Sequence, residues 1–257
     1  MTRPSVLIFA GLDPSGGAGI AADILAVAAQ GAHALPLVTT LTVQDNDHVF
    51  DALAVDSEIL ARQAHALIDK IEVKAVKIGI PGSRANAQVI ADVIGRLRRQ
   101  HPQLPVVLDP VLASGHGDAL ARGDAVQALA PLLALVTLIV PNLPEAIALS
   151  GAELTLSQQA QVLHARGCLH VLITGGHGPG AMVRNRWFGL GAERAWNWPR
   201  LPGHFHGSGC TLAAAIAARL AQGEPMALAL AGAQAYCHQA LAASYVIAPG
   251  QRIPLRC

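Results

Sequence analysis

The sequence predicts an α/β domain built on an open, mainly parallel sheet, and two observations support that prediction. First, short apolar runs alternate with longer helix-like stretches through most of the 257 residues. Second, these runs are about five residues long and lack polar alternation, as expected of strands that are buried on both faces. Such an order of strands and helices favours right-handed crossovers between parallel strands.

The expected elements follow one another without a linker, a repeat or a low-complexity segment. The strand candidates are Val6–Gly11, Leu35–Val43, Val73–Gly79, Pro105–Asp109, Val136–Val140 and Leu169–Thr174. The helix candidates are Gly19–Gln30, Ser57–Lys70, Arg84–Gln100, Gly123–Ala130, Pro144–Ser150 and Ser157–Arg166. After Gly180 the aromatic segment Met182–Trp198 predicts a hairpin-like pair of strands, and two Ala/Leu-rich helices, Gly209–Gln222 and Pro225–Ala243, follow it. We therefore expect a single domain over residues 1–257.

Composition and charge exclude several classes of protein. Apolar residues make up 52% of the chain and charged residues 14%, which is enough apolar material for a large core. The net charge is +1 with both signs interspersed, so no basic stripe is present for nucleic acid or an anionic membrane. The four cysteines form no C-x-x-C pair, and the apolar run Val6–Ala10 is too short to span a membrane. These features predict a cytoplasmic protein with neither nucleic acid nor membrane as its partner.

The first glycine-rich segment, residues 13–19, lies between a predicted strand and a predicted helix. Its glycines permit positive φ and close backbone approach, and the following helix offers free N–H groups. No G-K-[ST] follows, so it is not a Walker A loop, and G-x-G-x-x-G does not appear in register. A purely structural turn remains an equal alternative. Asp23, in the helix that follows, requires a partner unless it caps the helix or faces solvent.

The second glycine-rich segment is Gly207-Ser208-Gly209-Cys210, at the start of an Ala-rich helix. Consecutive N–H donors at a helix start can face a phosphoryl group, and the helix dipole favours negative charge there. The same field is expected to lower the pKa of the Cys210 thiol and favour the thiolate. The alternative is an ordinary glycine-rich helix start with a buried cysteine.

Polar residues also follow other predicted strands at the carboxyl edge of the sheet. Asn142 and Glu145 follow one strand and Asp109 ends another, which places oxygen ligands suited to Mg²⁺ at the edge where open α/β folds bind ligands. Glu145 is equally compatible with a first-turn helix charge. Gly175 and Gly176 form a further turn at this edge.

Together, these segments resemble the ribokinase-like superfamily and, within it, the bacterial hydroxymethylpyrimidine/phosphomethylpyrimidine kinases of thiamine biosynthesis. The motifs that carry the resemblance run in the family's order over about residues 5–222. They are D-P-S-G-G-A-G-I from Asp13, A-D at Ala22, L-T-V-Q ending at Gln44, K-I-G from Lys77, L-D-P-V from Leu108, P-N-L-P-E-A from Pro141, G-G-H from Gly175 and H-G-S-G-C-T from His206. Cys210 is the discriminating position, because sugar kinases of the superfamily have Asp there.

The resemblance implies a three-layer α/β/α fold and ATP-dependent phosphorylation of 4-amino-5-hydroxymethyl-2-methylpyrimidine, its monophosphate, or both. It implies a homodimer that uses ATP and Mg²⁺. The residues implied to be catalytic are Gly207, Ser208, Gly209 and Cys210, the last of which would orient or deprotonate the attacking hydroxyl. Those implied to bind the substrate are Ala18, Asp23, Gln44, Ile80 and Val111, with the Gln44 amide suited to an aminopyrimidine edge. Those implied to bind ATP are Thr174, Gly176 and His206, and those implied to organise the metal are Asp109, Asn142 and Glu145.

Two departures from the family bear on phosphate binding. Relatives often have lysine where this chain has Thr174 and Gly115. The segments after His177 and from Gly250 to Cys257 also differ from the family pattern. A pyridoxal-type vitamin kinase and a pyrimidine-binding relative without efficient transfer are therefore the alternatives.

Overall fold

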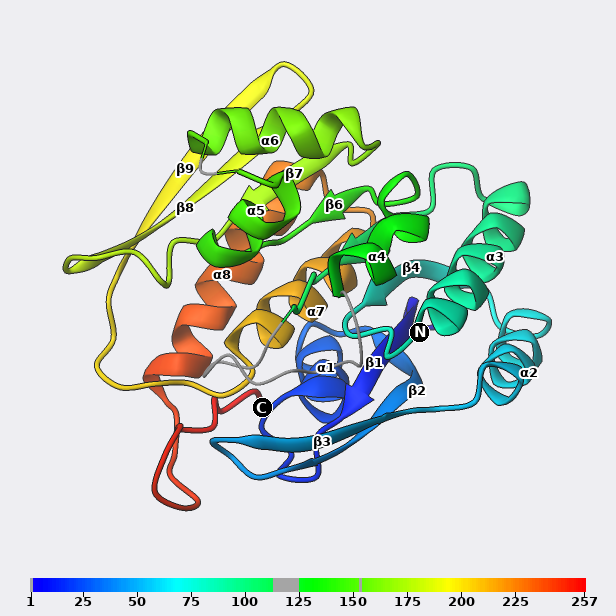
Figure 1. Ribbon diagram of the computed structural model, residues 1–257, viewed down its shortest axis with the longest axis horizontal. Coiled ribbons are helices and arrows are strands. Elements are labelled where there is room, and N and C mark those ends of the chain that lie inside the picture. The colour runs from blue at the N-terminus through cyan, green and yellow to red at the C-terminus, as the bar shows by residue number, and fades with distance from the viewer. Residues whose placement is uncertain (1, 113–124, 153) are drawn as a thin grey trace.

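The computed structural model describes residues 2–112, 125–152 and 154–257. Within these residues nine strands form one sheet in the order β3-β2-β1-β4-β5-β6-β7-β8-β9 (Figure 1). Their bounds are β1 Ser5–Leu12, β2 His33–Gln44, β3 Val49–Ala54, β4 Val73–Ile78, β5 Val106–Leu108, β6 Leu138–Ile139, β7 His170–Ile173, β8 Met182–Gly189 and β9 Ala192–Pro199. The six central strands, β2, β1, β4, β5, β6 and β7 in sheet order, pair in parallel. Strand β3 pairs antiparallel with β2 at one edge of the sheet, and β8 and β9 pair antiparallel at the other. The predicted mainly parallel sheet is confirmed.

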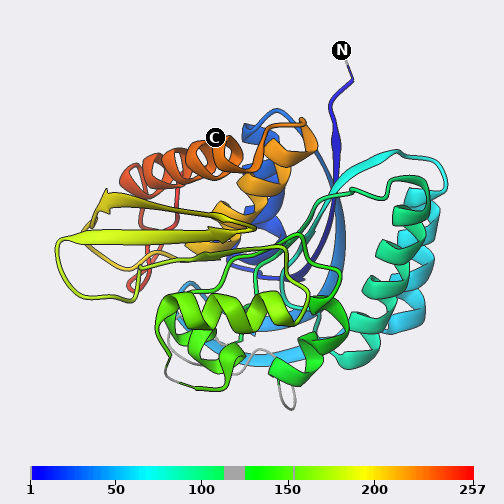
Figure 2. The ribbon, with the colours of Figure 1, turned by 90° about the horizontal axis from the view of Figure 1, so that it is seen from above.

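Helices cover both faces of the sheet, which confirms the three-layer arrangement (Figure 2). Successive strand residues point to opposite faces, so Leu7 and Phe9 of β1 join one core while Val6 and Ile8 join the other. The helices are α1 Gly19–Ala29, α2 Ser57–Ile68, α3 Arg84–Gln100, α4 Ala125–Leu133, α5 Leu143–Ser150, α6 Leu156–Ala165, α7 Ser208–Ala221 and α8 Met226–Ala242. Helices α2 to α6 pack on the first face, and α1, α7 and α8 pack on the second.

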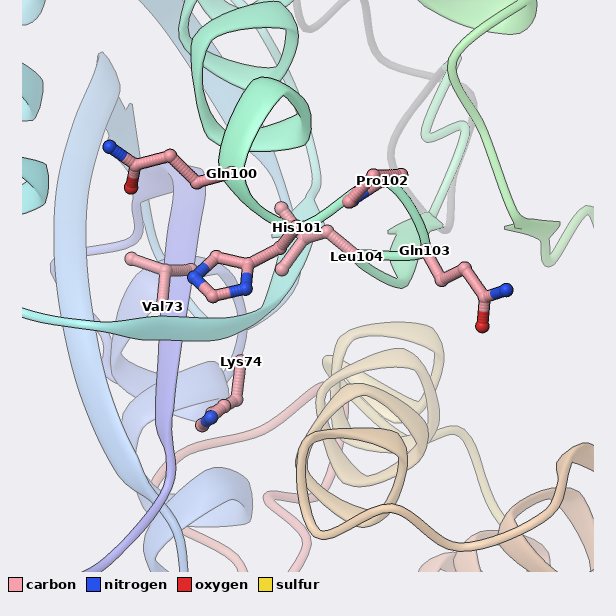
Figure 3. A pocket seen from close by; sticks show the side chains of 7 residues that line it. All are labelled: Val73, Lys74, Gln100, His101, Pro102, Gln103 and Leu104. Atoms are coloured by element: carbon pink, nitrogen blue, oxygen red, sulfur yellow. The ribbon is translucent and has the colours of Figure 1, made fainter.

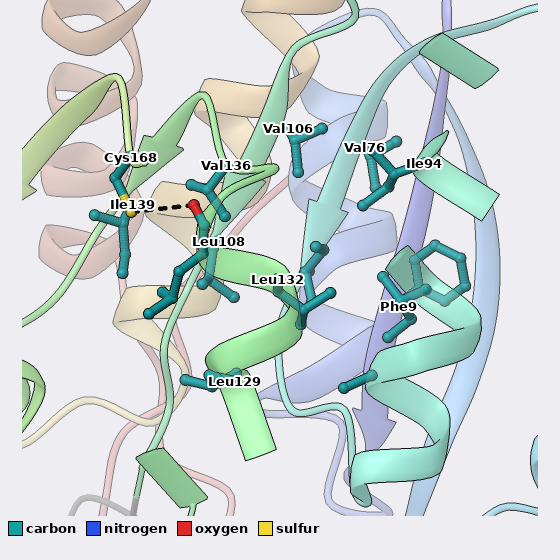
Figure 4. Close-up of a cluster of buried hydrophobic side chains, with 14 of the residues drawn as sticks. Phe9, Val76, Ile94, Val106, Leu108, Leu129, Leu132, Val136, Ile139 and Cys168 are labelled. Carbon is teal, nitrogen blue, oxygen red and sulfur yellow. Dashed lines mark hydrogen bonds between the residues drawn. The ribbon is translucent and has the colours of Figure 1, made fainter. Parts of the chain in front are cut away.

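The first core is built from branched aliphatic side chains of the strands and of α3 and α4 (Figure 4). Phe9, Leu108 and Leu132 are fully buried within it. The second core is built from small residues, since α7 buries six alanines from Ala213 to Ala221 against the sheet and its neighbouring helices. Small side chains let α7 approach closely, so that its first turn reaches the carboxyl ends of the central strands.

Two elements differ from the expectation. Strand β3 was not predicted, because none of its side chains is buried and it therefore lacks the apolar pattern of a strand. It is held by backbone pairing with β2, which extends to Gln44. The predicted helix Gly123–Ala130 extends further, to Leu133, and its residues 123–124 lie outside the described part of the chain. In the described residues, no helix combines the length and apolar character needed to cross a bilayer.

Candidate active site

The two glycine-rich turns lie directly against each other, although about 190 residues separate them in the sequence. Gly207, the residue before α7, has φ of +75°, and a β-carbon there would lie 2.2 Å from the carbonyl oxygen of Gly17 and 2.8 Å from the Cα of Ala18. Only glycine fits both this conformation and this contact. The starts of α1 and α7 therefore form one surface at the carboxyl edge of the sheet.

Asp13 organises the first turn and joins it to the second. Its Oδ2 accepts hydrogen bonds from the Ala18 amide at 2.7 Å and the Ser15 hydroxyl at 2.9 Å, and it lies 2.8 Å from His206 Nε2. Burial alone would raise the pKa of Asp13, but hydrogen bonds from His206, Gln44 and Ser15 hold it well below its ordinary value. Asp13 is therefore ionised, and it brings Gln44, Ala18 and His206 together.

A fully buried ion pair lies behind this surface. Lys77 Nζ of β4 and Asp23 Oδ2 of α1 are 2.7 Å apart, and both side chains are 0% exposed. Burial raises the pKa of Asp23, and the Lys77 ammonium opposes this rise and so favours the ionised carboxylate. Burial alone would lower the pKa of Lys77, but Asp23, Cys210 and Asp109 raise it above its ordinary value. The possibility that Asp23 caps the helix or faces solvent is wrong, because its partner is Lys77.

Cys210, in the first turn of α7, lies among these charges. Burial raises the pKa of its thiol to about 12, and Asp109 and Asp23 act in the same direction against the opposing effect of Lys77. The expected lowering of this pKa is therefore wrong, because burial and the Asp109 and Asp23 carboxylates raise the pKa of the thiol more than Lys77 lowers it. At neutral pH the side chain is a thiol and lies against the Asp109 carboxylate.

Asp109 follows β5 and faces the start of α7. A β-carbon on Gly209 would lie 3.6 Å from both of its carboxylate oxygens. The side chain is buried, which raises its pKa, while Lys77 and Cys210 act against this rise. Within the described residues Asp109 Oδ2 has no hydrogen-bond partner. A buried acceptor without a partner is costly, so Asp109 is suited to a ligand that supplies positive charge or a donor.

Asn142 and Glu145 bind each other across the start of α5. Asn142 Oδ1 accepts from the Glu145 amide at 2.9 Å, and Glu145 Oε2 accepts from the Asn142 amide at 2.8 Å. This capping box confirms that Glu145 has a structural role at the helix start. Burial and the nearby Asp109 carboxylate also raise the pKa of Glu145 to about 8, which a helix cap alone does not explain. Glu145 and Asp109 thus influence each other as two neighbouring carboxyl groups.

The turn after β7 places Thr174 beside Asn142, with the Thr174 amide donating to Pro141 O at 2.9 Å. Gly175 N donates to Asn185 Oδ1 at 2.9 Å. The buried side-chain amide of Asn185 in turn donates from Nδ2 to Gln234 Oε1 of α8. Arg200, which the sequence prediction missed, donates from its guanidinium to the carbonyl oxygens of Gly176, Gly178 and Gly180, all within 2.7 Å. One exposed arginine therefore holds the whole turn.

The two apolar residues implied for the pocket lie near the same edge. Ile80 and Val111 are both half-buried, and the Val111 amide donates to Asp109 O at 2.9 Å. Ile80 Cδ1 packs near Gly11 at the end of β1. Gly115 lies outside the described residues.

Lys77 and Arg256 are charged residues that the sequence prediction did not assign to the site. Lys77 had one usable signal, a lysine inside the apolar strand Val73–Ile78. Arg256 had none, because its segment has no regular structure and its contacts are with residues distant in the sequence. Arg256 Nε donates to Thr211 Oγ1 at 2.9 Å and its Nη2 donates to Gly17 O at 2.6 Å.

A surface hollow at the amino ends of β4 and β5 contains none of these residues (Figure 3). It is lined by Val73 and Lys74, at the start of β4, and by the segment 100–104 that leads into β5. Ligands of open α/β folds bind at the carboxyl ends of strands, so the cluster described above is the better site.

Known proteins match this chain over nearly its whole length. The family described as phosphomethylpyrimidine kinase matches residues 13–254 of the chain. A hydroxymethylpyrimidine/phosphomethylpyrimidine kinase of Rhizobium meliloti is 37% identical over 95% of this chain and 93% of its own length. A thiamine biosynthesis multifunctional protein of Corynebacterium efficiens is 34% identical over 94% of this chain and 33% of its own length. Among solved structures, the ADP complex of Bacillus subtilis pyridoxal kinase superposes with a TM-score of 0.87 at 27% identity, covering 98% of this chain and 97% of that one.

Proposed function

The chain belongs to the phosphomethylpyrimidine kinase family and is a phosphotransferase, and from that membership we propose how its site works. The reaction is ATP-dependent phosphorylation of 4-amino-5-hydroxymethyl-2-methylpyrimidine, its monophosphate, or both, in thiamine biosynthesis. The observation that supports it best is the start of α7, where free amides lie next to Cys210, Asp109 and Lys77. This arrangement combines donors for a phosphoryl group with charges that hold an attacking alcohol.

The pyrimidine ring binds against the first glycine-rich turn. Gln44 and Ala18 lie there because Asp13 holds both, and an amide side chain offers one donor and one acceptor to an aminopyrimidine edge. Ile80 and Val111 supply half-buried apolar contacts. Asp23 acts from behind this surface through Lys77, since its side chain is fully buried.

Phosphoryl transfer takes place over the start of α7. The transition state is loose, so positioning and charge stabilisation contribute most and a strong base contributes little. The amides of Gly207, Ser208, Gly209 and Cys210 bind the moving phosphoryl group. With a thiol pKa of about 12, Cys210 is a thiol at neutral pH and orients the attacking hydroxyl rather than removing its proton.

ATP binds along the turn after β7 and over α7. We call this turn, which contains Thr174 and Gly176, the nucleotide side of the site. Arg200 binds the carbonyl oxygens of the turn. His206 bonds to Asp13, so it connects the nucleotide side to the pyrimidine side. The ADP complex of the related pyridoxal kinase supports ATP as the phosphoryl donor.

Mg²⁺ fits the residues at the carboxyl edge. Asp109 has a buried oxygen with no partner among the described residues, and Glu145 has a pKa raised to about 8 by burial and by Asp109. A bound cation would give the Asp109 oxygen a partner and would favour the ionised form of Glu145. No cluster of three or more His, Cys, Asp or Glu side chains in the described residues is arranged for a metal. Mg²⁺ typically takes one or two carboxylates and completes its shell with water and phosphate, so Asp109, Asn142 and Glu145 would hold it with the nucleotide.

The chain acts as one domain over residues 1–257, and it acts in the cytoplasm. Two copies form a homodimer through β2 and β3. Leu41 and Leu53 are paired in register on these strands and both are exposed, as is Val43 beside them. An exposed apolar strip on an edge hairpin is otherwise an aggregation hazard, so a second copy is the economical cover.

A pyridoxal kinase activity is the second candidate, because the solved pyridoxal kinase superposes over nearly the whole chain. Purified protein should be incubated with MgATP and with the hydroxymethylpyrimidine, its monophosphate or pyridoxal in turn. ADP release with either pyrimidine, at a kcat/KM well above that for pyridoxal, is the expected result. ADP release with pyridoxal alone would replace the proposed substrate, and none with any alcohol would exclude a kinase.

A further inference from the structure

We propose that Arg256 is a positioning residue for phosphoryl transfer, which fixes the carbonyl groups of His206 and Gly207 behind the start of α7 and so aims the amides of Gly207 and Ser208 at the phosphoryl group. The proposal rests on the proposed kinase function and adds a residue that lies outside the motifs of the family resemblance. Arg256 comes from the last segment of the chain, which ends beside α1 and the start of α7 (Figure 1).

The guanidinium joins two segments of the chain, Gly17 and residues 206–211. Besides its bonds to Thr211 and Gly17, Nη2 lies 3.3 Å from His206 O and 3.4 Å from Gly207 O. Thr211 Oγ1 itself donates to Gly207 O at 2.8 Å. The Gly17 and Gly207 carbonyls belong to the two glycine-rich turns and the His206 carbonyl directly precedes the second. Because the C=O and N–H groups of one planar trans peptide point in opposite directions, holding these carbonyls on one side points the amides of Ala18, Gly207 and Ser208 to the other.

A second observation separates Arg256 from an ordinary structural arginine. Its side chain is buried, with the residue only 2% exposed, and every acceptor bound to its guanidinium in the described residues is a neutral oxygen. Its Nη1 has no partner there. Burial lowers the pKa of the guanidinium, and Cys210, Tyr236 and Asp23 only partly oppose this effect. A buried positive charge of this kind is costly in the empty protein and favourable once negative charge develops nearby.

The segment that carries Arg256 is hydrogen-bonded to α8. Tyr236 Oη of α8 donates to Arg256 O at 2.8 Å, and Leu255 N donates to Ala240 O at 3.0 Å. Both bonds tie the segment to α8, which packs on α7. Lysine cannot reproduce the contacts, because a single ammonium lacks the planar fork that reaches Thr211 and Gly17 together.

The test compares Arg256→Met, Arg256→Lys and Arg252→Met with the wild-type kinase. Arg252 is the matched control, since its side chain donates only to Ser244 among the described residues. We expect Arg256→Met to lower kcat by ~100-fold, the cost of misplaced catalytic groups. KM for the pyrimidine and for ATP should change by less than about threefold, because the lost effect belongs to the transition state. Arg256→Lys should lie between, and Arg252→Met should keep the wild-type kcat.

Added guanidinium ion, far below denaturing concentrations, should raise the kcat of Arg256→Met and leave that of Arg252→Met unchanged. The proposal is overturned if Arg256→Met or Arg256→Lys loses stability without a fall in kcat, if the loss appears only in KM, or if guanidinium restores nothing. If Arg256→Met does not fold, Arg256→Lys tests the proposal instead: its kcat should fall while its KM values change little. An inactive wild-type protein would instead reject the proposed function, which keeps the two failures distinct.

Discussion

The proposed acceptor side of the site, where α1 and α7 begin, buries its charges, whereas the proposed nucleotide side, the turn Thr174–Gly180, has almost none. On the acceptor side Asp23, Lys77 and Asp109 are buried around Cys210, and Arg256 closes the group from behind. On the nucleotide side the backbone is bound by the neutral side chain of Asn185 and by the exposed Arg200. The charge that the proposed mechanism offers to phosphate is therefore concentrated where α1 and α7 begin.

This difference explains how the chain can lack lysine at Thr174. Buried charges act in a low-dielectric surrounding, where each has a larger effect than an exposed lysine. The cost is instability, since buried charges must be paired to be tolerated. Changes on the acceptor side should therefore affect both folding and turnover, and changes on the nucleotide side should mainly affect the affinity for ATP.

The largest effect is expected from Lys77→Met, which leaves Asp23 buried without its partner. The free energy of unfolding should fall by ~3–5 kcal/mol, as measured for broken buried pairs. Chemical denaturation checks this. Lys74→Met on the same strand removes an exposed pair with Glu72 and should cost less than about 1 kcal/mol. Equal losses in the two variants would show that the buried pair is not special.

Cys210→Ala should lower kcat by ~100-fold or more while pyrimidine affinity changes little, because the thiol orients the hydroxyl in the transition state. Steady-state kinetics and a binding titration measure the two quantities. Cys168→Ala, in the core beneath α4 and α6, is the control and should keep its kcat. A comparable loss of affinity and turnover would make Cys210 a pocket wall instead of a chemical group.

Glu145→Gln should flatten the pH dependence of stability in the metal-free protein. The pKa of Glu145 is about 8 in the folded state, above its ordinary value of 4.5, so the folded state binds the extra proton. Its contribution to stability is therefore present at low pH and is lost as pH rises from about 5 to about 9. Thermal melts across this range test it, with Glu58→Gln on the exposed first turn of α2 as the control. Mg²⁺ binding should strengthen over the same range in the wild type, and a flat response there would exclude Glu145 from the metal site.

Arg200→Ala should raise KM for ATP by ~10-fold and leave kcat nearly unchanged, because the turn Gly176–Gly180 loses three hydrogen bonds on the nucleotide side. Arg194→Ala in β9, whose guanidinium lies over Trp196, is the control. A fall in kcat with KM unchanged would contradict the division between the two sides.

Thr174→Lys should have the smallest effect, lowering KM for ATP by about threefold through one partly exposed charge. A large rise in kcat from this change would mean that the acceptor side lacks charge, which is the opposite of the division between the two sides. Initial rates at varied ATP concentration distinguish the two outcomes.

The sequence predicted the parallel sheet and its helices because buried strands and amphipathic or Ala-rich helices leave patterns in the local sequence. Strand β3 left none, since neither of its faces is buried. Helix starts were predicted to within a few residues, and the capping box of Asn142 and Glu145 explains why α5 begins at Leu143.

The site was predicted less completely, for a physical reason. The glycine-rich turns and strand-end carboxylates are local signals, and the structure brings Asp109 and Cys210 together as those signals lead one to expect. The pKa of Cys210 depends on burial and on two distant carboxylates, so the helix start alone gave the wrong direction. Arg256 contacts Gly17, about 240 residues earlier, and no local pattern reveals such a contact.

The predictions about turnover depend on the start of α7 transferring a phosphoryl group from ATP to a hydroxymethylpyrimidine. Mass spectrometry of the pyrimidine after incubation with MgATP tests that transfer, and it also separates one transfer from two. We expect a pyrimidine that carries one or two additional phosphoryl groups with wild-type protein, and far slower product formation with Cys210→Ala. A pyrimidine that binds the wild-type protein but leaves with its mass unchanged would contradict the proposed transfer.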